Sequence, residues 1–249
     1  MMFDSRGLFP AITVLVAFIL TILCLFAGTR TDFLGDADIL TLYTPEGSTD
    51  SVAHDFYSVH VMSYCQGTLG AANLTTGVTH NVTKCSNRTI LFSFDPTQAW
   101  PKEITDGAGL EWPRVISDDF HAFRVTSQSM AILYCIGVGA MGAVLLVRAW
   151  TILAPQAAQG LFEFGFLMLG TLSTSIASII ATVLAFEFVA LINAHGKGSN
   201  VSAQYGEKFL GMTWAATGLL LVGSVACFVN VFVHGQAASP VPAEKDIEG

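Results

Sequence analysis

Three asparagine sequons and one cysteine crowd the stretch NLTTGVTHNVTKCSNRT, residues 73–89. An Asn-x-Ser/Thr triplet accepts an N-glycan only in a secretory lumen, and a structural disulfide persists only in an oxidising compartment. The chemistry that this stretch offers is therefore covalent modification outside the cytosol. With a fourth sequon farther along the chain, the candidate glycan acceptors are Asn73, Asn81, Asn87 and Asn200.

Cys65 and Cys85 are the two of the five cysteines that lie in hydrophilic sequence. The other three fall inside apolar runs, where an unpaired thiol usually serves as a small packing residue. A disulfide between Cys65 and Cys85 leaves no other pairing open, and closing a loop of about 20 residues stabilises a fold by roughly 3 kcal/mol in the chain-entropy treatment. Two unrelated free thiols are the alternative. Because no Cys-x-x-Cys is present, a thiol-redox enzyme has no motif.

The remaining polar residue types give little support to catalysis. No histidine has a second ligand at zinc spacing, and no nucleophile elbow, phosphate-binding loop or paired catalytic carboxylate motif occurs. We therefore expect no enzyme, no cofactor and no metal. Five histidines fall in segments predicted below to be extracellular, where they could sense pH, although ordinary loop histidines are the simpler interpretation. These are His54, His60, His80, His121 and His195.

Hydropathy indicates the elements that carry these residues. The chain has 249 residues, of which 52% are hydrophobic and only 12% charged, half the charged fraction of a soluble domain. Its mean hydropathy is +0.58. The apolar residues form four runs, each long enough for the roughly 20 residues that a membrane-crossing helix needs. The runs are Leu8–Ala27, Met130–Leu153, Leu161–Ala190 and Phe209–Val233. The first could be a signal peptide, but about 20 apolar residues exceed the 7–15 of such a segment.

Four spans place both tails on one side of the membrane and both larger loops on the other. All four sequons lie in those loops, so we expect extracellular loops and cytosolic termini. The positive-inside rule disagrees, because eight of the eleven basic residues would lie outside. We give the sequons more weight. The predicted order is a cytosolic N-tail at 1–7, spans at 8–28, 129–153, 161–192 and 209–233, extracellular loops at 29–128 and 193–208, a cytosolic link at 154–160 and a cytosolic C-tail at 234–249.

The first extracellular loop is predicted to fold rather than to be disordered. Phe56–Tyr64 and Thr89–Phe94 are rich in aromatic and β-branched residues and end in turn signals, which is typical of strands. The disulfide would join the end of the first strand to the chain just before the second. The loop carries 12 acidic and six basic residues, so nucleic acid is not an expected partner. The predicted fold is an all-α transmembrane four-helix bundle with a small extracellular antiparallel β-sheet.

Several features of this arrangement resemble claudin-like tetraspans, and in particular the fungal Sur-seven/PalI family of plasma-membrane proteins. The matching features are an aromatic approach to Cys-x-Gly, a second cysteine, and Phe-Ser-Phe-Asp-Pro at residues 92–96. Animal claudins instead have Gly-Leu-Trp before two closely spaced cysteines, which this chain lacks. The residues that carry the resemblance are Tyr57, Tyr64, Cys65, Gly67, Cys85, Phe92, Ser93, Phe94, Asp95 and Pro96.

The resemblance implies a non-enzymatic organiser of a plasma-membrane domain, of the kind associated with eisosomes, cell-wall integrity and endocytosis. The alternative that it implies is an accessory or sensor subunit in ambient-pH or cell-wall signalling, as in PalI-like members. Those members commonly carry long polar cytosolic tails, whereas Gly235–Gly249 is short, which favours the eisosome-type interpretation.

Small residues spaced by four follow one face of the third predicted span: Ser173, Ala177, Ala181 and Ala185. Such rows let helix backbones approach closely in lipid. The row could pack inside the bundle, or it could contact other membrane proteins or a second copy of the chain. Lipids and such lateral contacts are the expected partners.

Two carboxylates, Glu163 and Glu187, lie near the ends of the third span, 24 residues or about 36 Å apart along a helix. We expect them to mark the two membrane boundaries rather than to form a proton relay. Arg148, near the end of the second span, is expected to extend its guanidinium group to the headgroups.

Overall fold

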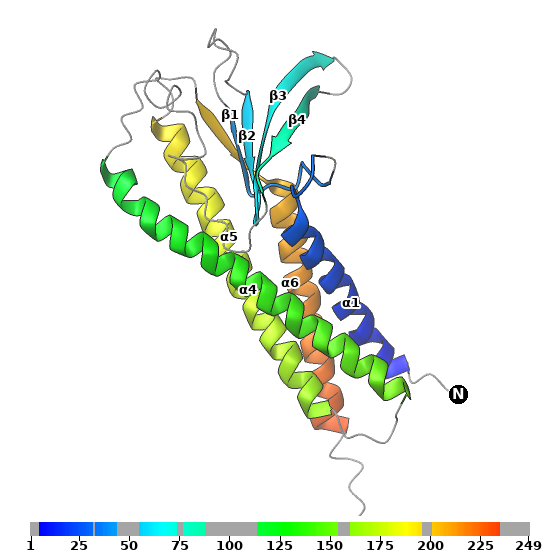
Figure 1. The fold of residues 1–249 in the computed structure, drawn as a ribbon. Coiled ribbons are helices and arrows are strands. Elements are labelled where there is room, and N and C mark those ends of the chain that lie inside the picture. Colours follow the sequence, from blue (N-terminus) through cyan, green and yellow to red (C-terminus); the bar gives the residue numbers. More distant parts are fainter. Residues whose placement is uncertain are drawn as a thin grey trace, which may run out of the picture.

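The protein is a four-helix bundle that carries a β-sheet at one end, which we call the sheet end (Figure 1). The computed structural model describes residues 5–31, 33–43, 55–73, 77–87, 114–153, 160–195 and 201–234. Its long helices are α1 (Ser5–Phe26), α4 (Arg114–Leu153), α5 (Gly160–His195) and α6 (Glu207–Phe228), and α6 continues as the π-helix η2 (Val229–His234). Each long helix contains an apolar stretch that can cross a membrane, which confirms the predicted four spans and makes this a multi-pass membrane protein.

The helix α4 is longer than the span predicted inside it. It begins at Arg114, whereas the predicted span begins at residue 129, and its apolar stretch runs only from Val125 to Trp150. The first turns of α4 therefore continue the helix beyond the stretch that is apolar enough for lipid. Hydropathy marks the solvent that a helix meets rather than the point at which its hydrogen bonding begins.

The sheet has five antiparallel strands in the order β4-β3-β2-β1-β5. Four strands come from the segment between α1 and α4: β1 (Leu40–Tyr43), β2 (Phe56–Val59), β3 (Tyr64–Asn73) and β4 (Gly77–Cys85). The fifth, β5 (Ser202–Tyr205), comes from the segment between α5 and α6 and pairs with β1. Both large loops therefore build one sheet, whereas only the first loop was predicted to contribute strands.

The strand predicted over Phe56–Tyr64 is wrong in one respect, because it is two strands. The chain turns back after Val59, where the backbone N–H of His60 donates to the carbonyl of Ser63 at 2.8 Å. At the tip of this β2–β3 turn, Val61 and Met62 are buried against the bundle. Their side chains do not follow the two-residue alternation of a strand, since they fill the space between helix ends. The second predicted strand, Thr89–Phe94, lies outside the described residues.

Three apolar clusters form the core, and two of them join the sheet to the bundle. One fills the far half of the bundle and includes Val14, Met141 and Leu220. A second lies under the β2–β3 turn, and a third joins β1, β2 and β5 to the end of α5 through residues such as Leu42 and Ile192. The sheet is therefore packed onto the bundle as part of the same core.

Candidate functional site

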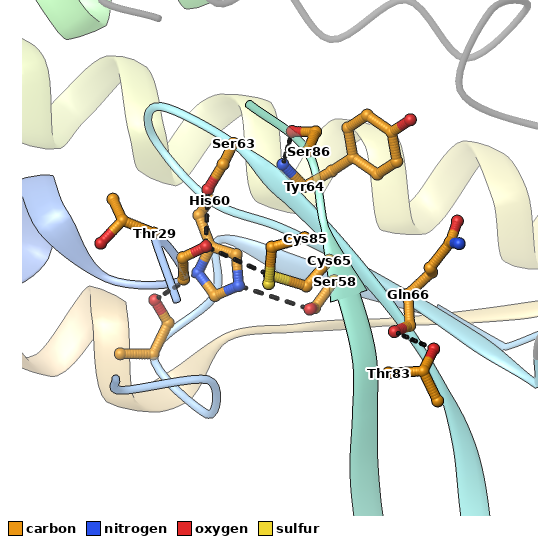
Figure 2. The surroundings of a disulfide bond; sticks show 12 residues. Thr29, Ser58, His60, Ser63, Tyr64, Cys65, Gln66, Thr83, Cys85 and Ser86 are labelled. Carbon is orange, nitrogen blue, oxygen red and sulfur yellow. Dashed lines mark hydrogen bonds between the residues drawn. A yellow bond between two sulfur atoms is a disulfide. The ribbon is translucent and has the colours of Figure 1, made fainter. Parts of the chain in front are cut away.

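The disulfide joins two neighbouring strands of the sheet. Cys65 at the start of β3 lies directly opposite Cys85 at the end of β4, and the two are bonded (Figure 2). Beside the bond, the Tyr64 amide donates to Ser86 Oγ at 3.0 Å and the Ser86 amide donates to the Tyr64 carbonyl at 2.8 Å. The predicted Cys65–Cys85 pair is confirmed. Its partner strand is Gly77–Cys85 rather than a strand beyond Cys85.

His60 lies next to this disulfide, at the point where the sheet meets the bundle (Figure 2). Its side chain is 1% exposed, and its Nδ1 lies 3.2 Å from the carbonyl oxygen of Ala37. Because a carbonyl only accepts, Nδ1 carries the proton in this contact. Burial lowers the pKa of His60 to about 4, so the ring is neutral near pH 7. His60 is therefore a buried junction residue and not an ordinary loop histidine.

The segment that follows α1 contacts His60 and the β2–β3 turn. Gly28 has a φ of +68°, a left-handed conformation that favours glycine, and a Cβ at this position would lie 2.1 Å from the His60 ring. The Ser63 hydroxyl donates to the Gly28 carbonyl at 2.8 Å. The β2–β3 turn and the end of α1 therefore determine each other's position.

The start of α6 meets the chain before β1 in a similar way. The Gly206 amide donates to the Ile39 carbonyl at 2.9 Å, and a Cβ on Gly206 would lie 1.6 Å from the Asp38 carbonyl oxygen. The Asp38 side chain is 7% exposed and accepts a hydrogen bond from the Thr41 hydroxyl. Burial raises the pKa of Asp38 to about 6, against the smaller opposing effect of that hydrogen bond.

An open groove of about 750 Å³ lies beside this junction. Its walls are the loop that follows α1 (31 and 34–37), β4 (80–82) and the first turns of α6 (208–212). Lys208 Nζ and Asp36 Oδ2 lie 2.9 Å apart in the groove, and their side chains are 68% and 72% exposed. The groove thus offers one accessible cation and one accessible anion side by side.

Inside the bundle, hydroxyl groups bind one another. Ser178 Oγ lies 2.7 Å from Thr213 Oγ1 and 3.1 Å from Thr217 Oγ1, and Tyr134 Oη lies 2.6 Å from Thr213 Oγ1. All four residues are buried, and the network links α4, α5 and α6. These polar groups satisfy one another, which is how buried hydroxyls stabilise helix contacts in lipid.

At the far end of the bundle, Arg148 forms an ion pair with Glu163. Their side chains are 25% and 10% exposed. The α4–α5 hairpin thus gives Arg148 a carboxylate partner that was not predicted from the sequence, and the extension of its guanidinium group to the headgroups stays a prediction. Glu187, at the other end of α5, is exposed.

The predicted small-residue row on α5 lies inside the protein. Ser173 is 5% exposed, and Ala177, Ala181 and Ala185 are 0% exposed. The three alanines belong to the same cluster as Val61 and Met62 at the tip of the β2–β3 turn. This row packs the bundle and is not available to a second protein.

The predicted glycan acceptors are placed only in part. Asn81 on β4 and Asn87 just after it are exposed. Asn73 ends β3, and nothing is described of its side chain, whereas Asn200 lies outside the described residues. Glycosylation at the four sequons stays a prediction.

The sequence matches the profile of the SUR7/PalI family over residues 6–226, from the start of α1 to near the end of α6. The chain belongs to the SUR7/PalI family. A search of curated proteins found no match. The SUR7/PalI assignment confirms the resemblance inferred from the cysteines and the aromatic residues around them.

Sequence reasoning missed four of these features: the burial of His60, the burial of Asp38, the Arg148–Glu163 pair and the groove. The ion pair had a signal, because residues 148 and 163 flank the short link between two antiparallel helices. Asp38 and the groove had none, since they depend on a contact between segments about 170 residues apart in sequence, joined by Asp36 and Lys208.

Proposed function

We propose that this SUR7/PalI member is a non-enzymatic plasma-membrane protein that organises a membrane domain of the eisosome type. The observation that carries the proposal is the union of sheet and bundle in one packed body. The β2–β3 turn enters the helix core, and β5 ties the second loop to the first. A tetraspan built this way holds its sheet at a constant height and orientation above the membrane.

The buried polar groups support a structural role rather than transport or catalysis. In the part of the chain that the structure describes, the hydroxyls of the bundle core bind one another, and Arg148 binds Glu163. Side chains that are hydrogen-bonded or ion-paired with one another in this way hold the helices in place. Large apolar side chains cover the outside of the bundle, among them Leu172, Leu221 and Val225, each more than half exposed. Those surfaces face lipid and neighbouring membrane proteins.

The proposed orientation follows the sequons. The sheet end, with Asn81 and Asn87 exposed on it, faces the cell exterior, and both termini face the cytosol. We expect glycan on one or more of the four sequons.

Imaging tests this proposal. A fluorescent tag on the cytosolic C-terminus of an organiser should mark patches that persist and exchange slowly after photobleaching, at neutral and at alkaline external pH. An unrelated multi-pass protein with the same tag should be diffuse in the same cells. A diffuse distribution of the chain itself would contradict the organiser role.

A second candidate, an accessory or sensor subunit in ambient-pH or cell-wall signalling, is favoured by one observation. The carboxyl of Asp38 is buried at the junction, and Asp36, Lys208 and Tyr43 are the charged or titratable groups that interact with it electrostatically, while Thr41 donates a hydrogen bond to it. A pKa of about 6 makes Asp38 respond to acidification rather than to alkaline conditions. Movement of the tagged protein out of patches when the external pH is lowered from 7 to 5, through the pKa of Asp38, would favour this second function over the first.

A further inference from the structure

The groove at the sheet end lies where lipid headgroups meet the protein. Its upper wall is β4 of the sheet, and its lower wall reaches Gly211 and Met212 on α6. Gly211 is four residues past the start of α6 at Glu207, or about 6 Å along the helix. The interfacial layer of a bilayer is about 5–7 Å thick on each side. The groove therefore spans that layer, from the aqueous sheet to the first turns of a membrane-crossing helix.

The charges of the groove suit a zwitterion. Lys208 and Asp36 are both more than two-thirds exposed, and an ion pair between such groups contributes only about 0–1 kcal/mol. A phosphate can therefore replace Asp36 as the partner of Lys208, while an ammonium group takes the place of Lys208 beside Asp36. A headgroup with a net negative charge would leave the Asp36 carboxylate facing it without compensation.

The surface of α6 below the groove can receive an acyl chain. Gly211, Ala215 and Gly218 are all exposed and follow one another at helical spacing, which leaves a shallow smooth strip down the helix. Trp214 borders the strip, and its indole Nε1 donates to Thr182 Oγ1 on α5 at 3.0 Å, which holds the ring in place. The strip starts at Gly211, which also lines the groove.

We propose that the groove and this strip together bind one phospholipid with a zwitterionic headgroup from the leaflet on the sheet side. The phosphate binds Lys208, the ammonium group lies beside Asp36, and one acyl chain follows Gly211, Ala215 and Gly218. The site is independent of whether the protein forms patches in cells.

Native mass spectrometry of the purified full-length protein tests this site. The protein, in a mild detergent, is given equal amounts of phosphatidylcholine and phosphatidylglycerol with identical acyl chains. We expect one phosphatidylcholine retained per chain, in preference to phosphatidylglycerol. Lys208→Met should weaken that retention about tenfold, since it removes a charge-assisted contact to phosphate.

A matched pair of glycine variants separates this site from general lipid contact. A Cβ at Gly211 and a Cβ at Gly139 would both meet nothing within 4 Å, and both positions are exposed, so a side chain can be added at either without a clash at its Cβ. Gly211→Leu fills the groove floor and should abolish the retained lipid. Gly139→Leu makes the same change on an exposed part of α4, away from the groove, and should retain lipid as the unmodified protein does.

Three results would overturn the proposal. The first is equal lipid retention by the Gly211→Leu and Gly139→Leu variants. The second is a preference for phosphatidylglycerol. The third concerns the sequon at Asn81, which lines the groove. If phosphatidylcholine is retained only after N-glycans have been removed, a glycan and not a lipid occupies the groove of the glycosylated protein.

Discussion

The two ends of the bundle each carry an ion pair among the described residues, and the two pairs differ in their surroundings. Arg148 and Glu163 join α4 to α5 at the far end with side chains 25% and 10% exposed. Asp36 and Lys208 join the loop after α1 to α6 at the sheet end with side chains 72% and 68% exposed. Removing one partner of a buried pair leaves an uncompensated charge, whereas exposed partners return to water. The Arg148–Glu163 pair therefore holds helices together, whereas Asp36 and Lys208 are free to exchange partners.

The sheet end obtains its rigidity by other means. The disulfide, the buried β2–β3 turn and the close approaches at Gly28 and Gly206 replace a buried ion pair there. Because backbone contacts and a covalent bond hold the sheet end together, its charged groups can stay at the surface. The comparison suggests that the far end is built for helix packing and the sheet end for contact with other molecules.

The substitution expected to lower stability most is at the far end of the bundle. Glu163→Leu should lower the free energy of unfolding by roughly 3–5 kcal/mol, because the mostly buried Arg148 guanidinium loses its carboxylate. Denaturant unfolding in detergent micelles measures this loss. Glu187→Leu makes the same change at an exposed position of α5 and should have little effect. Equal losses in the two variants would mean that burial of the pair does not matter.

Loss of the disulfide should have the second-largest effect on stability. The double variant Cys65→Ser, Cys85→Ser should lower stability by about 3 kcal/mol, because the unfolded chain regains the freedom of the 20-residue loop. We expect retention in the secretory pathway, visible by microscopy. Cys135→Ala removes a thiol that lies outside the sheet and should traffic normally. Detection of free thiols at both Cys65 and Cys85 in non-reduced peptides would contradict the bond.

Two buried groups of the sheet end should show opposing pH effects. The pKa of His60 is lowered from 6.5 to about 4, so the unfolded state binds more protons as pH falls through this range, and stability falls by about 2 kcal/mol at pH 5. The pKa of Asp38 is raised from 3.8 to about 6, so the folded state holds the proton, and stability rises by about 1 kcal/mol over the same change.

Each group can be removed to expose the effect of the other. His60→Asn should become more stable as pH falls from 7 to 5, and Asp38→Asn should become less stable, measured as the shift of the thermal midpoint. A His60→Asn variant with the same pH profile as the unmodified protein would show that His60 is not neutral and buried.

The smallest effect on stability is expected from a substitution in the exposed Asp36–Lys208 pair. Lys208→Met should change the free energy of unfolding by no more than about 1 kcal/mol, because both charged groups remain hydrated without each other. The same denaturant titration measures it beside Glu163→Leu. A loss of 3 kcal/mol or more would remove the distinction between the two ends.

The sequence predicted the four spans, the cysteine pair and the presence of a sheet, because hydropathy and residue type report directly on the solvent and the compartment. It could not predict which face of α5 is buried. The row from Ser173 to Ala185 shows helical spacing, but in lipid both faces of a helix are apolar, so the pattern does not distinguish interior from exterior.

Strand pairing was also beyond sequence reasoning. β5 has the sequence SAQY, with no run of β-branched or aromatic residues, and it becomes a strand because α5 and α6 bring it beside β1. The division of Phe56–Tyr64 into two strands has the same cause. Val61 and Met62 have the composition of a strand interior, but the helix ends offer them a better place to be buried.

Because β1 pairs with β5, the sheet cannot be completed until most of the chain has been synthesised. Leu40 on β1 lies opposite Tyr205 on β5, so the first strand waits for about 165 more residues before its second neighbour exists. At 5–20 residues per second, that delay is roughly 8–33 s. During this interval β1 has an open edge, and the cavity that will receive Val61 and Met62 lacks α6, which supplies Phe209 and Leu210 to it. The sheet can therefore be completed only after β5 has been synthesised, and its packing onto the bundle is complete only when α6 joins. Until then β1 has an unpaired edge of the kind that associates with other strands.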